Sequence, residues 1–243
     1  MHRWPEQLLV WNAVGATAAH AHHAAHVVLA TRGHVGAKVG RARVEGAGIW
    51  VPSNVAHAIE RAEAPTVVLY VEPTSPIGAG LASVLGEEPA SIAEDVRDVA
   101  VSGLGARDAG SPLAATQVLE ALGVREGRAE IDARVARLLR WLEESELGKD
   151  EVALGALAAR AGVSPTRLTH LFTSDVGTPL RRYVLWLRVR RALAALASTG
   201  DPIASIAARS GFADAAHLSR TMRSTFGMTP TQLLRAKAIT PSA

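Results

Sequence analysis

Short runs of β-branched apolar residues fill the first third of the chain. The runs HVVLAT, RARVE, GIWVP and TVVLYVEP are separated by Gly, Pro and Asn, which favour turns. Several short strands at this spacing are typical of a small barrel or sandwich. We therefore expect a β-domain up to about residue 76.

The apolar pattern changes to helical spacing after residue 76. Between Ile92 and Leu104 the apolar positions fall near one stripe of a helix. Ser111 followed by Pro112 provides a cap and a first-turn proline for another helix. The segment 123–127 has the composition of a linker, and the sequence after it predicts only helices.

The length of the chain favours more than one domain. Its 243 residues are 48% apolar, which is ample for buried cores. We expect a multidomain α and β protein with three parts. These are a β-barrel over residues 1–76, a helical linker or dimerisation segment over 77–126, and an all-α domain over 127–243.

The all-α part contains an internal repeat. The segment LGALAARAGVSPTRLTHLF (Leu154–Phe172) is similar to IASIAARSGFADAAHLSRTM (Ile203–Met222). In each copy a short apolar helix ends in Ala-Ala-Arg-x-Gly, and Gly162 and Gly211 suit a sharp turn with left-handed backbone. A Ser or Asp can then cap the next helix. Helix, glycine turn and capped helix are the pattern of a helix-turn-helix motif.

A helix without Gly or Pro separates the two motifs. We expect the motifs at about residues 152–174 and 203–224, and the connector at about 179–198. A helix of this length spans roughly 30 Å. Major-groove entries on one face of B-DNA lie about 34–36 Å apart, so the connector can hold two recognition helices for consecutive turns of the duplex.

The charge distribution favours a polyanionic partner. The net charge is only +3, but from Leu154 onward 12 Lys and Arg residues face three Asp. A basic segment of this kind attracts nucleic acid.

Composition excludes several classes of protein. The chain has no cysteine, which excludes disulfides, thiolate catalysis and Cys-ligated zinc fingers. Its apolar runs stay below the length of about 18 residues that a membrane span needs, and its N-terminus lacks the pattern of a secretion signal. We expect a protein of the bacterial cytoplasm.

The stretch SIAARSGFADAAHLSRTMRSTFGMTPTQLLR resembles the signature of the AraC/XylS family of bacterial transcription regulators. The resemblance covers about Ala133–Lys237, and the first copy of the repeat follows the same pattern. His170 stands where the family often has Arg, and Leu218 where it usually has Phe. The resemblance implies a regulator, such as a transcriptional activator, that binds double-stranded promoter DNA as a homodimer.

By this resemblance two helices, 164–173 and 214–223, enter the major groove. Their apolar anchors should be buried: Leu168, Leu171 and Phe172 in the first, and Leu218 and Met222 in the second. The expected DNA contacts on the opposite faces are Ser164, Thr166, Arg167, Thr169, His170, Ala215, Ala216, Ser219, Arg220 and Arg223. Arg167 and Arg220 are the expected base readers, because Arg bonds O6 and N7 of guanine together. Arg223 is as suited to a phosphate.

Histidines are concentrated near the N-terminus, where HAHHAAH places four of them within His20–His26. On a strand alternate side chains share a face, so His20, His22 and His26 point one way and His23 the other. The turn PSNVAH brings His57 to a later strand. Imidazole ligands suit zinc, nickel, copper or iron, and the sequence does not choose among these divalent transition metals.

The spacing of the histidines resembles the two motifs of the cupin barrel. The residues that fit are Gly15, His20, His22, His26 and Gly33 for the first motif, and Pro52, Asn54 and His57 for the second. His replaces Glu in the first motif, and Asn, which tolerates a left-handed turn, replaces Gly in the second. Many AraC-type regulators carry a cupin sensor, so the resemblance implies a domain that binds a metal or small-molecule effector. Histidines that line an organic-ligand pocket, or merely fill the barrel, remain an alternative.

A cupin metalloenzyme of dioxygenase or hydrolase type is the alternative function, because histidine-bound metals activate water or dioxygen. Four acidic residues are candidates for a catalytic acid or base, namely Glu45, Glu60, Glu63 and Glu72, and none stands at a cupin acid position. We therefore expect a regulator without catalytic residues. Its effector would shift the helices between residues 77 and 122, the expected dimer contact, and so select the half-sites that the dimer occupies.

Overall fold

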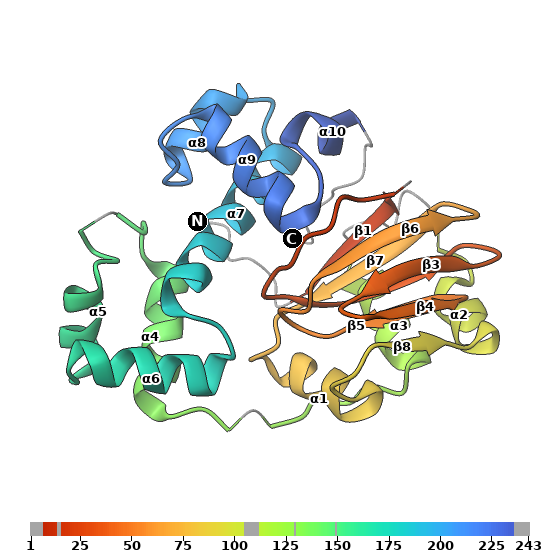
Figure 1. Ribbon diagram of the computed structural model, residues 1–243, viewed down its shortest axis with the longest axis horizontal. Helices are drawn as coiled ribbons and strands as arrows, with labels where there is room; N and C mark the ends of the chain where they lie inside the picture. The colour runs from red at the N-terminus through yellow and green to blue at the C-terminus, as the bar shows by residue number, and fades with distance from the viewer. Residues whose placement is uncertain (1–6, 14–15, 105–111, 129, 149, 236–243) are drawn as a thin grey trace.

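The computed structural model describes residues 7–13, 16–104, 112–128, 130–148 and 150–235 (Figure 1). A sheet-rich N-terminal part is followed by a helical C-terminal part. The N-terminal elements are β1 (Gln7–Ala13), β2 (Ala25–Ala30), β3 (Val35–Val39), β4 (Ala42–Gly46), β5 (Gly48–Val51), β6 (His57–Ala62), β7 (Thr66–Val71), α1 (Pro76–Leu85), β8 (Ala90–Ile92), α2 (Glu94–Val101) and α3 (Pro112–Ala121). The C-terminal elements are α4 (Ala133–Glu144), α5 (Leu154–Ala161), α6 (Pro165–Val176), α7 (Leu180–Ser198), α8 (Ile203–Arg209), α9 (Ala215–Phe226) and α10 (Pro230–Arg235). Gly15 and Ser111, which the sequence patterns include, lie outside the described residues.

The described strands form two antiparallel sheets, with orders β1-β7-β2-β5-β8 and β4-β3-β6. Val28, Ile49 and Val68 of the larger sheet and Val35 of the smaller one share a buried cluster. The closed barrel expected from the sequence is not formed by these strands. The physical reason is that β5 pairs with β2 on one edge and with β8 on the other, which leaves β4 no edge to join.

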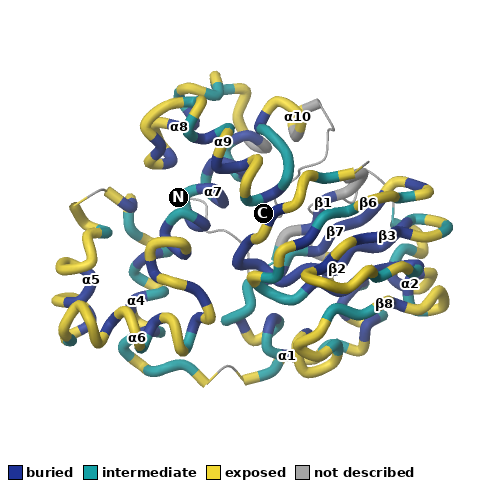
Figure 2. Tube along the Cα trace, in the orientation of Figure 1, coloured by how far each residue is buried: buried dark blue, intermediate teal, exposed yellow. Residues whose placement is uncertain are grey.

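The larger sheet is buried on both faces, which explains its continuous apolar runs. In β2, Val28 faces the smaller sheet, whereas Val27 and Leu29 belong to a second cluster together with Leu81 of α1 and Val118 of α3. A strand covered on both sides needs apolar residues at every position rather than at alternate ones. Figure 2 shows β2 as buried, and the residues of β7 are buried except for the partly buried Tyr70.

The segment 77–126 differs from the expectation that it is entirely helical. It contributes β8 to the larger sheet and packs α1, α2 and α3 on the outer face of that sheet. Ile92, expected on one helical stripe with Val99, lies in β8, whereas Val99 is 60% exposed on α2. The sequence period was misleading here because the helix begins only at Glu94. The boundaries at residues 76 and 126 remain predictions.

The C-terminal helices enclose one apolar cluster. α7 runs through its middle and contributes Tyr183, Val189 and Leu193, among other residues, while α4 contributes Leu138 and Leu142. Figure 1 places α5 and α6 at one end of α7 and α8 and α9 at the other. None of the helices in the described part of the chain combines the length and the apolar content that crossing a bilayer requires.

Candidate DNA-binding surface and histidine cluster

The first copy of the repeat folds as two helices joined by a tight turn. α5 ends at Gly162, whose φ of +69° is the left-handed conformation expected from the sequence. The Ser164 hydroxyl caps α6 by accepting a hydrogen bond from the amide three residues later at 3.3 Å. Leu168 and Phe172 anchor α6 in the core, whereas Leu171 is only partly buried.

The second copy repeats this construction. Gly211 follows α8 with a φ of +80°, and the Asp214 carboxylate caps α9 by accepting a hydrogen bond from the His217 amide at 2.6 Å. Leu218 and Met222 are fully buried, as the sequence predicts. In both copies a capped helix therefore turns one face inward and leaves the opposite face to solvent.

The expected DNA contacts stay outside the core. The exposed ones are Ser164, Thr166, Arg167, Thr169, His170, Ala216, Arg220 and Arg223, and the partly buried ones are Ala215 and Ser219. Two hydroxyls already donate to a carbonyl one turn earlier, Thr169 to Pro165 at 3.0 Å and Ser219 to Ala215 at 2.8 Å. Their oxygens remain able to accept a hydrogen bond, so the guanidinium groups are the stronger donors on this surface.

The arginines of the two recognition helices differ from those of the connector. Among the described residues, no carboxylate pairs with Arg167, Arg220 or Arg223. In α7, by contrast, Arg190 is buried and pairs with Glu143 at 2.8 Å. Arg191 donates to the carbonyls of Leu142 and Glu143, near the C-terminus of α4, each at 3.1 Å. The connector therefore uses part of its charge to hold the helices together.

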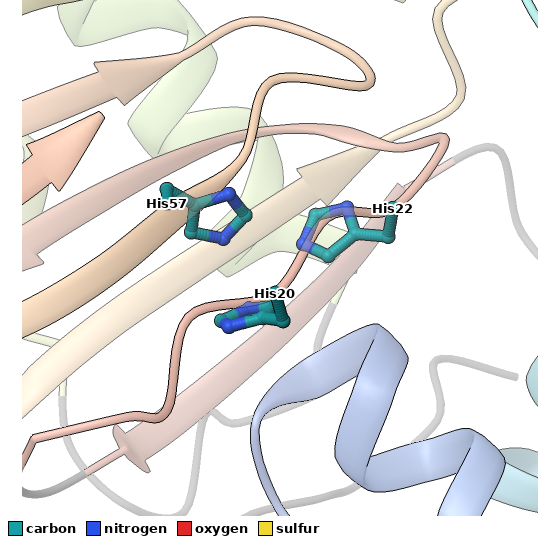
Figure 3. Close-up of side chains that lie close together, drawn as sticks. All are labelled: His20, His22 and His57. Atoms are coloured by element: carbon teal, nitrogen blue, oxygen red, sulfur yellow. The ribbon is translucent and has the colours of Figure 1, made fainter. Parts of the chain in front are cut away.

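The four predicted metal ligands come together between the two sheets. One ring nitrogen each of His20, His22 and His57 lies within 4.8 Å of the others, and Figure 3 shows the three rings turned toward one another. The His26 ring centroid lies 4.8 Å from that of His22 and 4.6 Å from that of His57. His23 points away from them toward Glu72, as the sequence predicts.

The backbone that carries these histidines is not the continuous strand expected from the sequence. β2 begins at Ala25, and before it only His20 forms an isolated bridge, in which its amide donates to the carbonyl of His57 at 2.9 Å. Asn54 adopts the left-handed conformation predicted for it, with a φ of 61°, and its amide donates to the His22 carbonyl at 2.9 Å. These long-range backbone hydrogen bonds, rather than strand alternation, bring the imidazoles of His20, His22 and His57 together.

Hydrogen bonds fix the protonation of three rings. The Nδ1 atoms of His20, His22 and His57 lie 2.8, 2.9 and 2.9 Å from the carbonyl oxygens of nearby residues. A carbonyl only accepts, so each Nδ1 carries the proton and each Nε2 keeps its lone pair. The His22 Nε2 is buried and has no hydrogen-bond partner among the described residues.

The electrostatics of the cluster favour neutral rings. Burial lowers the pKa of His57 to about 4, with a further contribution from the charge of His20. Burial also lowers the pKa of His20, and it lowers those of His22 and His26 further, because neighbouring histidines add to the effect. Neutral imidazole with a free Nε2 is the form that binds a metal, and a carbonyl on the other nitrogen is its usual support.

Both parts of the protein line the cavity at this cluster. Its volume is about 40 Å³, and its lining includes His20, His26 and His57 from the sheets and Phe226 and Met228 from the end of α9 and the following loop. A water molecule needs roughly 10–15 Å³ of such space, so the cavity suits an ion with one or two waters rather than an organic molecule.

The helix-turn-helix surface has relatives among known proteins. A family profile described as a helix-turn-helix domain matches residues 157–236, which include both glycine turns, both capped helices and the connector. The chain carries an AraC-type helix-turn-helix domain. The family resemblance of the sequence is thereby confirmed for the region of this AraC-type domain.

Two curated regulators are similar to part of the chain. The HTH-type transcriptional regulator Rv1931c of Mycobacterium tuberculosis is 38% identical over 85 residues, which are 35% of this chain and 33% of that protein. The HTH-type transcriptional activator RhaS of Escherichia fergusonii is 32% identical over 112 residues, 46% of this chain and 40% of that protein. The chain thus matches less than half the length of either relative.

The whole fold has a neighbour among solved structures. ToxT from Vibrio cholerae aligns with 95% of this chain and 96% of its own, with a TM-score of 0.62 and 12% sequence identity. At this identity the likeness shows the fold alone. The arrangement of a sheet-rich N-terminal part followed by a helical C-terminal part is therefore shared between the two proteins.

A largely buried carboxylate that the sequence did not single out as a contact links the two parts. Glu72 follows β7, and its oxygens lie 2.6 Å from Nε2 of His23, 3.4 Å from the indole nitrogen of Trp186 and 3.4 Å from Arg190 of the AraC-type domain. Burial alone would raise the pKa of Glu72, but His23, Arg190 and the Thr74 hydroxyl lower it to about 2. The sequence of α7 contains five arginines, more than a helix in the core needs, and this surplus is the signal of the contact that the sequence offers.

Proposed function

We propose that the protein is a sequence-specific regulator of transcription that binds double-stranded promoter DNA with α6 and α9. The observation that carries the proposal is the pair Arg167 and Arg220. Both project from capped recognition helices of the AraC-type domain, both are exposed, and neither has an acidic partner among the described residues.

The connector supports simultaneous contact by both helices. α7 has 19 residues, and a helix of that length spans about 28 Å. With one helix-turn-helix unit at each end, this length approaches the separation of successive major-groove entries, about 34–36 Å. We therefore assign base contacts to Arg167 and Arg220 and a phosphate contact to Arg223.

Footprinting on promoter fragments from the source genome, followed by anisotropy titrations, tests this assignment. Arg220→Ala and Arg167→Ala should each relax the preference for one base, by about 1–3 kcal/mol of discrimination. Arg223→Ala should weaken the binding of all DNA sequences alike and lower the slope of log affinity against log salt concentration by about one. Arg41→Ala, an exposed arginine between β3 and β4, is the matched control and should change neither. A wild-type protein that protects no promoter segment would refute the proposal.

We further propose that the N-terminal part is a cupin-like sensor and that His20, His22, His26 and His57 hold a divalent transition metal, such as zinc, nickel, copper or iron. Three buried histidines that bring one ring nitrogen each within 4.8 Å of the others, lowered pKa values and a cavity of ionic size support this fit. Elemental analysis of the purified protein, with the quadruple His→Ala variant as control, tests the site. A metal content that is unchanged in the variant would refute it.

A small organic effector is the alternative. A second cavity of about 270 Å³ lies between the two parts, lined by His22, His23, Arg182 and Trp186, among others. Because the cationic side chain of Arg182 is part of its lining, this cavity suits a small anionic molecule. A ligand that raises the melting temperature of a His20/His26/His57→Ala variant, which leaves the lining of this cavity unchanged, as much as that of the wild type would support this alternative.

We propose no catalytic role for the cluster. Glu45 pairs with Arg61 and Glu60 with Arg43, the Glu63 carboxylate accepts from the His34 amide, and Glu72 is held in the contact with α7. The nearby acids are therefore engaged away from the imidazoles of His20, His22, His26 and His57. We expect the quadruple His→Ala variant to lose the response of operator affinity to metal. We expect the metal-loaded wild type to show neither oxygen uptake nor hydrolysis.

A homodimer is part of the same proposal. Val99 on α2 and Leu113 on α3 are 60% and 80% exposed, and these two helices pack against each other. An apolar pair of this kind at the surface supports a contact with a second copy. Val99→Asp together with Leu113→Asp should give a monomer in sedimentation velocity, and an unchanged dimer would place the contact elsewhere.

A further inference from the structure

The AraC-type domain covers the histidine site directly. Phe226, the last residue of α9, stacks on the imidazole of His22 with ring centroids 5.4 Å apart and an interplanar angle of 29°. A Cβ on the next residue, Gly227, would lie 3.0 Å from Nδ1 of His20. Met228 then lines the same small cavity as His20 and His57. Three consecutive residues, the last of the second recognition helix and the two that follow it, thus form one wall of the site.

The residue at the cavity differs in chemistry from the imidazoles. Met228 offers a thioether, which is a soft ligand that favours copper(I) over zinc, nickel or iron(II). The chain has no cysteine and only two other methionines. Of these, Met222 is fully buried in the core beneath α9, and Met1 lies outside the described residues. Met228 is therefore the thioether that the described structure brings to the histidines.

We propose that the histidine site is completed by Met228, so that a copper(I) ion bound by imidazoles of the cluster His20, His22, His26 and His57 and by the Met228 thioether joins the sensor part to the second helix-turn-helix unit. This inference rests on the proposed metal site and names its metal and its regulatory contact. Because the loop with Met228 directly continues α9, the bound ion fixes the end of that recognition helix.

The consequence for DNA binding is a coupling between two sites in one chain. Copper(I) stabilises the arrangement in which the end of α9 contacts the sheets, and operator DNA selects its own arrangement of α9. When copper(I) and DNA prefer the same arrangement of α9, each raises the affinity for the other; when they prefer different ones, each lowers it. The factor is the same in both directions. The Met228→Leu variant removes this coupling and leaves both recognition helices intact.

The test uses the full-length protein, loaded anaerobically with copper(I) or separately with zinc. X-ray absorption of the copper-loaded wild type should show a sulfur ligand, which can come only from methionine in a chain without cysteine. Met228→Leu should lose this sulfur and bind copper(I) on the order of tenfold or more weakly in competition with a chelator, with zinc affinity unchanged. Met222→Leu, a substitution of similar volume in the core, is the matched control and should keep the sulfur.

Operator affinity gives the second readout. It should differ between copper-loaded and metal-free wild type, and the difference should vanish in Met228→Leu. The inference is overturned if copper-loaded wild type shows only nitrogen ligands, or if the sulfur persists in Met228→Leu. In either case zinc binding that is lost in the quadruple His20/His22/His26/His57→Ala variant would still support the proposed metal site. A wild type that binds neither zinc nor copper(I) would refute both.

Discussion

Gly227 and His20 are in close contact: a Cβ at Gly227 would lie 3.0 Å from Nδ1 of His20 and 3.0 Å from the carbonyl oxygen of Ala18. Gly227 also ends α9 in the left-handed conformation, with a φ of +69°. One residue therefore satisfies two demands, a helix end and a close approach between the two parts of the protein. A side chain at this position would disturb both.

Gly227→Ala should destabilise the protein more than Gly162→Ala. Both glycines end a helix with a φ of +69°, but nothing lies within 4 Å of a Cβ at Gly162. Gly162→Ala therefore measures only the backbone strain, about 1–2 kcal/mol. The excess in Gly227→Ala, measured by chemical denaturation, reports the contact with the histidine segment. Equal losses of stability in the two variants would mean that the histidine segment moves away from the added methyl group at no energetic cost.

Glu72→Gln should weaken the association of the two parts. It removes the charge that faces His23 and Arg190, and hydrogen bonds to charged groups contribute about 1.5–3 kcal/mol. We expect a loss of this size in the free energy of unfolding and separation of one transition into two. Glu60→Gln breaks an exposed pair with Arg43 and should change stability by less than about 1 kcal/mol. Similar losses in both variants would contradict a linking role for Glu72.

The helix-turn-helix units could be predicted from the sequence because their signals are local. Gly162 and Gly211 have the predicted left-handed backbone, and Asp214 caps the helix it precedes. Each signal acts within a few residues, so a short stretch of sequence contains all of it. The exposure of Arg167 and Arg220 then follows from the burial of their neighbours.

The environment of the histidines could be predicted only in part. Residue type and spacing predicted that His20, His22, His26 and His57 form one cluster. They did not predict that the segment between His20 and β2 is irregular, because its partner, His57, lies far along the chain. The wall formed by Phe226 and Met228, like the bond between Glu72 and Trp186, joins residues more than 100 positions apart. No period in the sequence records such contacts.

The stability of the metal-free protein should fall as the pH decreases from about 6.5 to about 4. His57 keeps a neutral ring in the folded protein until its pKa of about 4, whereas in the unfolded chain it binds a proton near 6.5. Between these values the unfolded state binds more protons, which costs the folded state about 1.4 kcal/mol per pH unit for each such histidine. Above 6.5 the contribution is constant.

His57→Gln should reduce the slope of stability against pH in that window, measured by urea denaturation with a chelator present. Burial lowers the pKa values of His20, His22 and His26 as well, so part of the slope should remain in the variant. A wild-type stability that is flat between pH 6.5 and 5 would show that the buried rings are not kept neutral.

Asp214→Ala and Asp214→Asn separate the cap of α9 from the charge at its start. The carboxylate accepts a hydrogen bond from the His217 amide at 2.6 Å. Asn caps a helix about as well as Asp, whereas Ala costs about 1 kcal/mol. Asp214→Ala should therefore lower stability and fray the turn that carries Ala215 and Ala216, with weaker operator binding in anisotropy titrations. Asp214→Asn should keep the stability and bind at least as tightly, because it removes a negative charge near the phosphates. If both variants bind the operator as well as the wild type, the first turn of α9 does not contact DNA.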